Sequence, residues 1–319
     1  MILRFTFPRL LAIATLALAV VSGCGDDTPV DPVPSTDTTS NALYVTAPNV
    51  VNCSEGVLKD AERTKVLNYV NAIRAKLGLA PVLYRHEEDA GTAKAALIIA
   101  ANSTLSHEPA SSASCWSQAG FTTSGVSNLA IGTSSGTALR SSESFVDLWI
   151  KDSTITSLGH RRWLIDPFLK FISFGRVDKI GTGTTRTVSG SAIQVIYAEQ
   201  QTLGSSTPEF VAFPYHETSA QLFNSGIFMS FSTIADRTGS GGNASVKYDN
   251  ATVTIRTESG QSVPVTIVGS DNQGFGLPNV LIWKASVAND TRYNVTVSGV
   301  DVNGVTKTFD YWFTTNTTT

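Results

Sequence analysis

The sequence is poor in cysteine, histidine and charged side chains, and each shortage narrows what the protein can be. Its 319 residues include 3 cysteines and 4 histidines, and only 15% of them carry a charge. The formal net charge of −3 supplies no basic field that could hold a nucleic acid backbone. We therefore expect no nucleic acid among the partners of this protein.

The apolar run near the N-terminus is too short to cross a membrane. It extends from Leu10 to Val21 behind Arg4 and Arg9, whereas a transmembrane helix needs about 20 apolar residues. A short apolar run behind basic residues is typical of a secretory signal peptide. We predict that residues 1–23 are this signal.

Small residues precede the first cysteine at the end of that run. Ser22, Gly23 and Cys24 resemble a bacterial lipobox, in which the cysteine becomes the lipid-modified first residue of the mature protein. The resemblance implies a lipoprotein held to the membrane through Cys24, in the extracytoplasmic part of a bacterial cell envelope, at the periplasmic face or the cell surface. The alternative is an ordinary cleaved signal with an incidental cysteine.

The segment after Cys24 has the composition of a disordered linker. From Gly25 to Asn41 it contains three prolines and almost no large apolar side chains, so it cannot bury enough surface to fold. We predict that residues 24–44 are a lipidated, disordered tether.

The two remaining cysteines, Cys53 and Cys115, are candidates for a disulfide. A metal site would require more ligands at closer spacing, whereas an oxidising compartment allows two distant cysteines to form a bond. The sequence therefore predicts a Cys53–Cys115 disulfide.

Helical patterns come before strand patterns in the first two thirds of the chain. Between Asp60 and Leu77 apolar residues recur at helical spacing, and Gly78 follows as a C-cap. Segments rich in β-branched and aromatic residues come later and predict strands. Further helices are expected at residues 87–101 and 141–152 and at a short segment near 160, and strands at 171–177 and 191–199.

The last third of the chain has a different pattern. Short alternating segments are separated by Asn, Asp, Gly and Pro, which is typical of an antiparallel β-sandwich. The ending YNVTVSGVDVNGVTKTFDYWFTT is similar to the last strands of bacterial immunoglobulin-like modules. We predict an all-β, immunoglobulin-like domain at residues 205–319.

Several motifs, taken in order, resemble the signature of the CAP (SCP-like) superfamily. They are VLNYVNAIRAKLGLAPVLY, LSHE, GVSNLAIG, a tryptophan-bearing helix, GHRRWLIDP and FGRV. Asn71, Arg74 and Gly78 carry the opening motif, and the resemblance covers about residues 60–180. It implies an α+β chain in which a three-layer α-β-α sandwich at residues 45–204 precedes the β-sandwich.

The resemblance also implies a cleft that holds two histidines. His107 and His160 match the family pair, and such imidazoles can bind a divalent cation or act as general base and acid. Ser127 stands where the family has the glutamate of a G-E-N motif, and an uncharged hydroxyl is a poor ligand beside a carboxylate. We therefore expect a ligand cleft with little catalysis, formed by His107, Ser127, Asn128, Trp149, His160 and Arg161.

Two acids could replace the missing glutamate. Glu108 is adjacent to His107, and Asp152, which we rank first, follows the tryptophan-bearing helix. With His107 and His160 they are the candidate catalytic residues, and the two histidines are the candidate ligands of a divalent cation such as zinc. A Ser/His/Asp arrangement with Ser127 has no nucleophile-elbow motif, and Ser127 lies in a loop-like context.

Three functions remain open. The first is binding of a small apolar or peptide-like ligand, or of an envelope or extracellular protein, by the two-histidine cleft. The second is metal-assisted hydrolysis of envelope peptides or glycans. The third is an adhesive or structural role in which the β-sandwich recognises partners.

Overall fold

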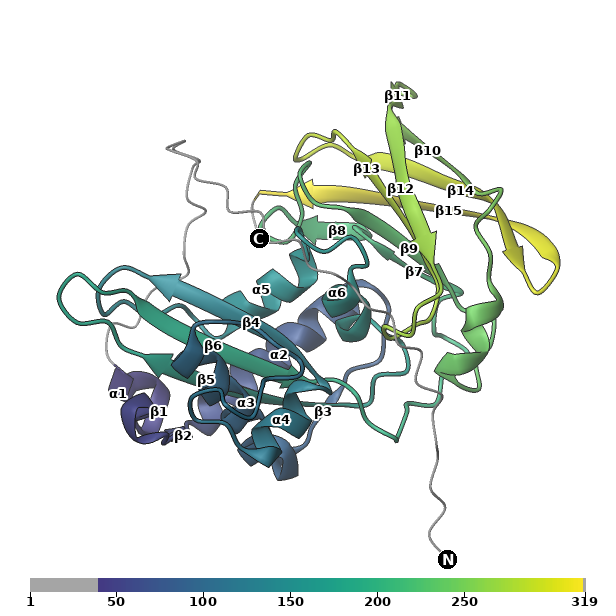
Figure 1. The fold of residues 1–319 in the computed structure, drawn as a ribbon. Coiled ribbons are helices and arrows are strands. Elements are labelled where there is room, and N and C mark those ends of the chain that lie inside the picture. The colour runs from purple at the N-terminus through teal and green to yellow at the C-terminus, as the bar shows by residue number, and fades with distance from the viewer. Residues whose placement is uncertain (1–39, 318–319) are drawn as a thin grey trace, which may run out of the picture. The chain divides into compact units, whose positions relative to one another are not determined.

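The computed structural model describes residues 40–317 (Figure 1). The predicted signal peptide, the predicted lipidation site at Cys24 and most of the predicted tether lie outside these residues. Between residues 40 and 317 no helix is both long enough and apolar enough to cross a membrane.

A four-stranded sheet forms the centre of the N-terminal part. β5, β6 and β4 are antiparallel neighbours, and the short β3 is parallel to β5. The prediction that Ser127 lies in a loop is wrong, because it is the first residue of β4. The first four residues of this strand are all buried, so it lacks the alternating pattern that reveals a strand. The strand order is β3 (Leu83–Tyr84), β5 (Phe171–Lys179), β6 (Thr187–Gln194), β4 (Ser127–Ser134).

Two helices cover one face of this sheet. α3 (Asp89–Asn102), which follows the 3-10 turn η2 (His86–Glu88), packs on β5 and β6, and α4 (Gln118–Ser124) packs on α3. The close approach depends on glycine, since a Cβ atom at Gly190 would lie 2.3 Å from the carbonyl oxygen of Ala96. The alanine-rich sequence of α3 thus fits a sheet surface without large side chains.

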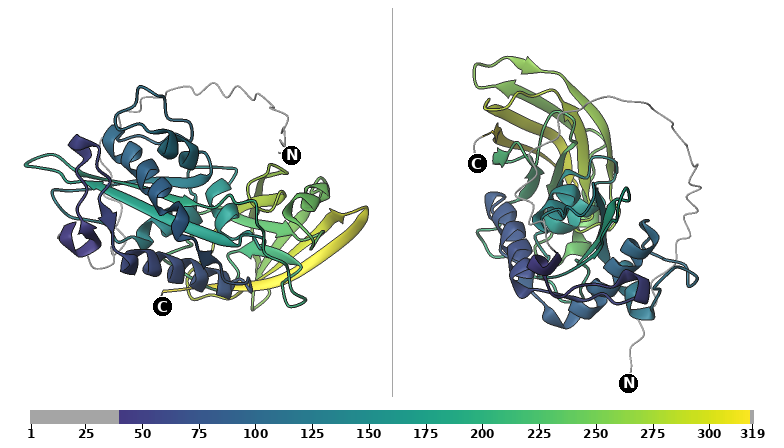
Figure 2. Two further views of the ribbon diagram at one scale, coloured as in Figure 1. Left: turned by 90° about the horizontal axis from the view of Figure 1, so that it is seen from below. Right: turned by 90° about the vertical axis from the view of Figure 1, so that its left-hand side faces the viewer.

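Helices also cover the opposite face, as Figure 2 shows. They are α2 (Asp60–Lys76), α5 (Glu143–Lys151) and, beside α5, α6 (Gly159–Leu164). Arg176 of β5 is fully buried on this side, with its guanidinium 5.4 Å from the ring of Phe145 in α5. The three-layer α-β-α architecture implied by the CAP resemblance is therefore confirmed.

The first described residues are already packed against the fold. Leu43 and Tyr44 are buried, and the Tyr44 hydroxyl donates to Asp178 Oδ2 at 2.5 Å. The folded structure thus begins earlier than the predicted boundary at residue 45. The elements of this segment are α1 (Ser40–Leu43), β1 (Tyr44–Thr46), the 3-10 turn η1 (Val50–Asn52) and β2 (Val57–Leu58).

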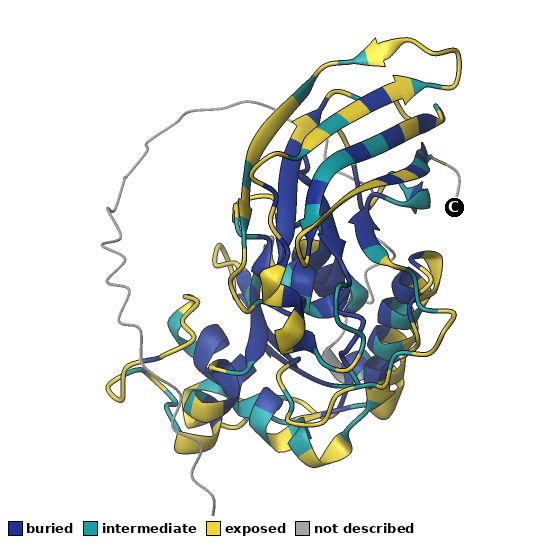
Figure 3. Cartoon of the chain, turned by 90° about the vertical axis from the view of Figure 1, so that its right-hand side faces the viewer, coloured by how far each residue is buried: buried dark blue, intermediate teal, exposed yellow. Residues whose placement is uncertain are grey.

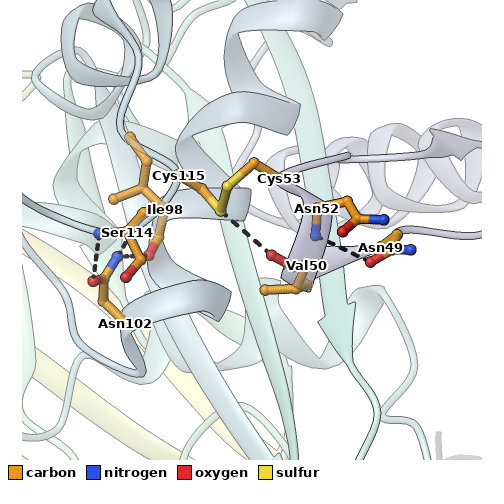
Figure 4. The surroundings of a disulfide bond; sticks show 8 residues. All are labelled: Asn49, Val50, Asn52, Cys53, Ile98, Asn102, Ser114 and Cys115. Carbon is orange, nitrogen blue, oxygen red and sulfur yellow. Dashed lines mark hydrogen bonds between the residues drawn. A yellow bond between two sulfur atoms is a disulfide. The ribbon is translucent and has the colours of Figure 1, made fainter.

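The predicted disulfide is confirmed. Cys53 follows η1 and bonds to Cys115, which lies between α3 and α4 (Figure 4). Asn102, at the end of α3, holds the same loop by donating to the carbonyl of Ser114 and accepting from its backbone N–H. The bond therefore joins the N-terminal segment to the outer helical layer.

The C-terminal part consists of two sheets and one 3-10 segment, η3 (Ser240–Ser245). Their orders are β11-β10-β14-β15-β8 and β12-β13-β9-β7. Bands of different burial along these strands are visible in Figure 3. The strands are β7 (Phe210–Phe213), β8 (His216–Ser219), β9 (Met229–Thr233), β10 (Thr252–Thr257), β11 (Ser262–Val263), β12 (Val265–Asp271), β13 (Val280–Ala285), β14 (Tyr293–Val302), β15 (Val305–Asn316).

The all-β character of this part is confirmed, with one correction. β8 pairs with the end of β15 in parallel, so the predicted antiparallel pattern does not hold throughout. The alternation of side chains that identifies a strand does not depend on the direction of its neighbour. The immunoglobulin-like assignment stays a prediction.

Two arginines of α6 join the layers to the C-terminal sheets. Arg161 is fully buried and donates to the carbonyls of Ile150 in α5 and Phe228 before β9, at 2.6 and 2.7 Å. Arg162 forms a 2.7 Å ion pair with Asp271 at the end of β12. Both contacts lie within one compact unit. α6 is therefore fixed from two sides.

Replacement of both Cys53 and Cys115 by serine should lower the free energy of unfolding by about 2–4 kcal/mol, since the bond closes a long loop in the unfolded chain. The two residues are 62 positions apart. Urea denaturation of the oxidised parent and the double variant measures the difference. Reduction of the parent should lower its stability to that of the variant; equal stability before and after reduction would contradict the prediction.

The buried carboxyl of Asp166 should make stability fall as the pH rises from about 4 to 6.5. Burial raises its pKa from 3.8 to about 6, and the hydrogen bond from the Phe168 backbone N–H, together with the charges of Arg74 and Arg162, offsets this only in part. Because the folded pKa is above the unfolded one, the associated stability is complete below pH 4 and lost as the pH passes 6. The parent should lose about 3 kcal/mol of unfolding free energy over this range, whereas Asp166→Asn, which cannot ionise, should not. Urea denaturation of both proteins at pH 4 and pH 7 measures the difference. Parallel pH profiles would refute this assignment.

Candidate functional site: a two-histidine pocket

A pocket of about 390 Å³ contains both predicted histidines. Its volume lies within the roughly 300–1,000 Å³ of small-molecule sites. Apolar residues and glycines in its wall outnumber the polar residues. The lining residues are His107, Gly125, Ser127, Asn128, Ile155, Ser157, Gly159, His160, Trp163, Val195, Ile196, Gly274 and Phe275.

Asp152 orients His160 in this pocket. Asp152 Oδ1 lies 2.9 Å from His160 Nδ1, and Oδ2 accepts from the backbone N–H of the same histidine at 3.0 Å. Asp152 is 3% exposed and has a left-handed backbone, with φ of 45°. A carboxylate oxygen accepts a hydrogen bond from Nδ1–H, so Nε2 is the ring nitrogen left for a ligand.

His107 is oriented by a backbone carbonyl. Its Nδ1 lies 2.8 Å from the carbonyl oxygen of Ser124, at the end of α4. A carbonyl oxygen can only accept, so Nδ1 carries the proton and the neutral ring has its lone pair on Nε2. The rings of His107 and His160 are 6.5 Å apart between centroids. The pocket therefore contains two imidazoles whose Nε2 atoms act as acceptors when the rings are neutral.

The first two residues of β4 complete the polar part of the wall. Asn128 donates to the carbonyl of His160 at 2.9 Å, which ties β4 to α6. Ser127 is 4% exposed, and its Oγ has no hydrogen-bond partner among the described residues. A buried hydroxyl without a partner costs free energy. Ser127 Oγ is thus a group that a bound ligand could satisfy.

A residue of the opening family motif holds α6 in position although it lies far from α6 in the sequence. Arg74 of α2 is fully buried and donates through Nη1 to the carbonyls of Leu164, the last residue of α6, and of Asp166, at 2.9 and 2.8 Å. Burial lowers its pKa to about 10. Asn71 exchanges two hydrogen bonds with the backbone of Val82. These residues are structural supports of the site.

Three residues that the sequence assigned to the site do not line the pocket. Trp149 is a core residue that donates through Nε1 to the carbonyl of Leu129. Arg161 is fully buried, and its guanidinium donates to the carbonyls of Ile150 and Phe228. Glu108 is exposed, and its backbone N–H donates to Ser106 Oγ. The predictions for these three residues are therefore corrected.

Other lining residues carry no sequence signal of a site. Val195 and Ile196 follow β6 and fall within a predicted strand, whereas Gly274 and Phe275 come from the loop between β12 and β13. Phe275 is more than one hundred positions from His160 in the sequence. Only the folded chain brings these residues together.

The donor set does not fit a catalytic zinc ion. Such sites have three protein ligands, and no group of three or more His, Cys, Asp or Glu side chains that could hold a metal occurs within residues 40–317. Both oxygens of Asp152 are already bonded to His160. A metal here would have two imidazoles and no third protein ligand.

The comparisons with known proteins agree with the fold. Residues 67–186 match the family model described as the cysteine-rich secretory protein family, CAP. A search of curated proteins found no match. The matched segment includes His107, Ser127, Asp152 and His160 and ends before the C-terminal sheets. The chain thus contains a CAP domain of the cysteine-rich secretory protein family.

Proposed function

We propose that the protein binds a small amphipathic ligand in the two-histidine pocket. The observation that carries this proposal is an apolar cavity of about 390 Å³ whose wall also contains the unpartnered hydroxyl of Ser127. Ile155, Trp163 and Ile196 would surround the apolar body of the ligand.

The chemistry of the histidines defines the polar end of the ligand. In their neutral forms His107 and His160 use Nδ1 as donor, so their Nε2 atoms accept. A hydroxyl or amine group can donate to such an atom, whereas an ether or ester oxygen cannot. We therefore propose a ligand with a hydrogen-bond donor at its polar end.

Hydrolysis is a second candidate function, favoured by one observation. The Asp152–His160 pair has the carboxylate–imidazole arrangement of general-base catalysis. Against it, Ser127 Oγ is bonded to neither imidazole, so it is not activated as a nucleophile. The metal-assisted form lacks a third protein ligand among residues 40–317. Binding is therefore the function that the geometry supports best.

We further propose that the protein acts as a lipoprotein of the cell envelope. The lipobox-like sequence at Cys24 supports this location. The Cys53–Cys115 disulfide supports it too, because disulfides persist in oxidising compartments. The pocket would then meet extracytoplasmic ligands.

Two isomeric compounds test the ligand proposal. Nonan-1-ol should displace the fluorescent probe 8-anilinonaphthalene-1-sulfonate at about fivefold to tenfold lower concentration than 1-methoxyoctane, which has the same atoms but no donor. In His107→Ala or His160→Ala this preference should shrink. His86→Ala is the matched control, since this imidazole is 64% exposed and lies outside the pocket. Equal potency of the two compounds in the parent would refute the proposal.

Lipidation at Cys24 can be tested by expression in bacteria with radiolabelled palmitate. The parent should incorporate label and sediment with membranes, because an acylated cysteine partitions into the bilayer. Cys24→Ala should lose both properties, while Cys53→Ala should retain the label. Membrane association of the unlabelled Cys24→Ala protein would show that another segment acts as the anchor.

A further inference from the structure

The wall of the pocket includes a loop that does not belong to the CAP domain. Gly274 and Phe275 lie in the connection between β12 and β13. The family match ends at residue 186, almost ninety positions earlier. The C-terminal sheets therefore contribute directly to the site.

An arginine of α6, Arg162, bonds to this loop at both of its ends. The Arg162 guanidinium donates to Asp271 Oδ1 and to the carbonyl of Gln273, each at 2.7 Å, and to the carbonyl of Leu277 at 3.2 Å. Its side chain is 3% exposed, and burial lowers its pKa. An almost fully buried guanidinium bonded at both ends of a loop restricts the positions that the loop can take.

Glycines allow the loop to approach α6 closely. Gly276 has φ of +62°, and a Cβ atom there would lie 2.5 Å from the carbonyl oxygen of Arg162. At the start of α6 a Cβ atom on Gly159 would lie 3.2 Å from Phe275 Cδ1. The ring of Phe275 thus rests directly on the helix that carries His160, 5.5 Å from the Arg162 guanidinium.

We propose that Phe275 is a specificity-determining residue, which limits the size of the apolar body that the pocket accepts. This inference rests on the proposed binding function. Phe275 is only half-buried in the structure, so part of its ring is available to a ligand. A smaller side chain at this position enlarges the space, and a larger one reduces it. The CAP domain supplies the polar groups, and the C-terminal part sets the size limit.

A series of alcohols from hexan-1-ol to dodecan-1-ol tests the inference, with displacement of 8-anilinonaphthalene-1-sulfonate as the measurement. In Phe275→Ala the longest alcohols should gain roughly tenfold in affinity relative to hexan-1-ol. In Phe275→Trp the preference should shift the opposite way, toward shorter chains. Two opposite shifts distinguish a size limit from a general loss of folding.

The matched control is Phe121→Ala, the same change at a half-buried phenylalanine outside the pocket. Its chain-length profile should equal that of the parent. An unchanged profile in both Phe275 variants, with the parent still preferring nonan-1-ol over 1-methoxyoctane, would overturn this inference alone. A parent that does not distinguish those two compounds would instead refute the proposed function. Circular dichroism of each variant tests whether the fold is retained.

Discussion

The buried guanidinium groups of α6 are the interaction on which the rest of the structure depends. A charged group that is removed from water needs hydrogen-bond partners for its donors, and Arg161 and Arg162 find most of theirs where α5, the residue before β9 and the β12–β13 loop converge. These hydrogen bonds therefore hold α6 in place between its partners. Because His160 precedes the two arginines, the same constraint places an imidazole in the pocket.

The pocket combines oriented polar groups with apolar side chains in its wall. His160 is oriented by Asp152, and His107 is oriented by a carbonyl at the end of α4. Neither imidazole bonds to Ser127, whose hydroxyl is buried without a partner. An oriented pair of acceptors beside apolar walls is suited to recognition of one donor group on an otherwise apolar molecule. Ser127 carries no charge that such a molecule would have to compensate.

The C-terminal sheets have a part in the site beyond that of a spacer. Their β12–β13 loop is bonded to α6 through Arg162 and brings Phe275 to the pocket wall. Without these sheets the pocket wall would lack Gly274 and Phe275, Arg162 would lose most of its hydrogen-bond partners, and Arg161 would lose Phe228 and Ser230. The two parts of the chain are thus linked by hydrogen bonds through α6, and both supply residues to the pocket wall.

Local patterns were enough to predict much of this architecture. The spacing of apolar residues predicted α2 at residues 60–77, and the ordered motifs predicted the α-β-α layers and the histidine pair. The disulfide was predicted from the number and the spacing of the cysteines. β4 was missed because its burial removes the alternating pattern that identifies a strand. Trp149, Arg161 and Glu108 were misplaced because the direction of a side chain depends on what packs around it. Phe275 has no motif, so only the tertiary structure could decide its place in the pocket.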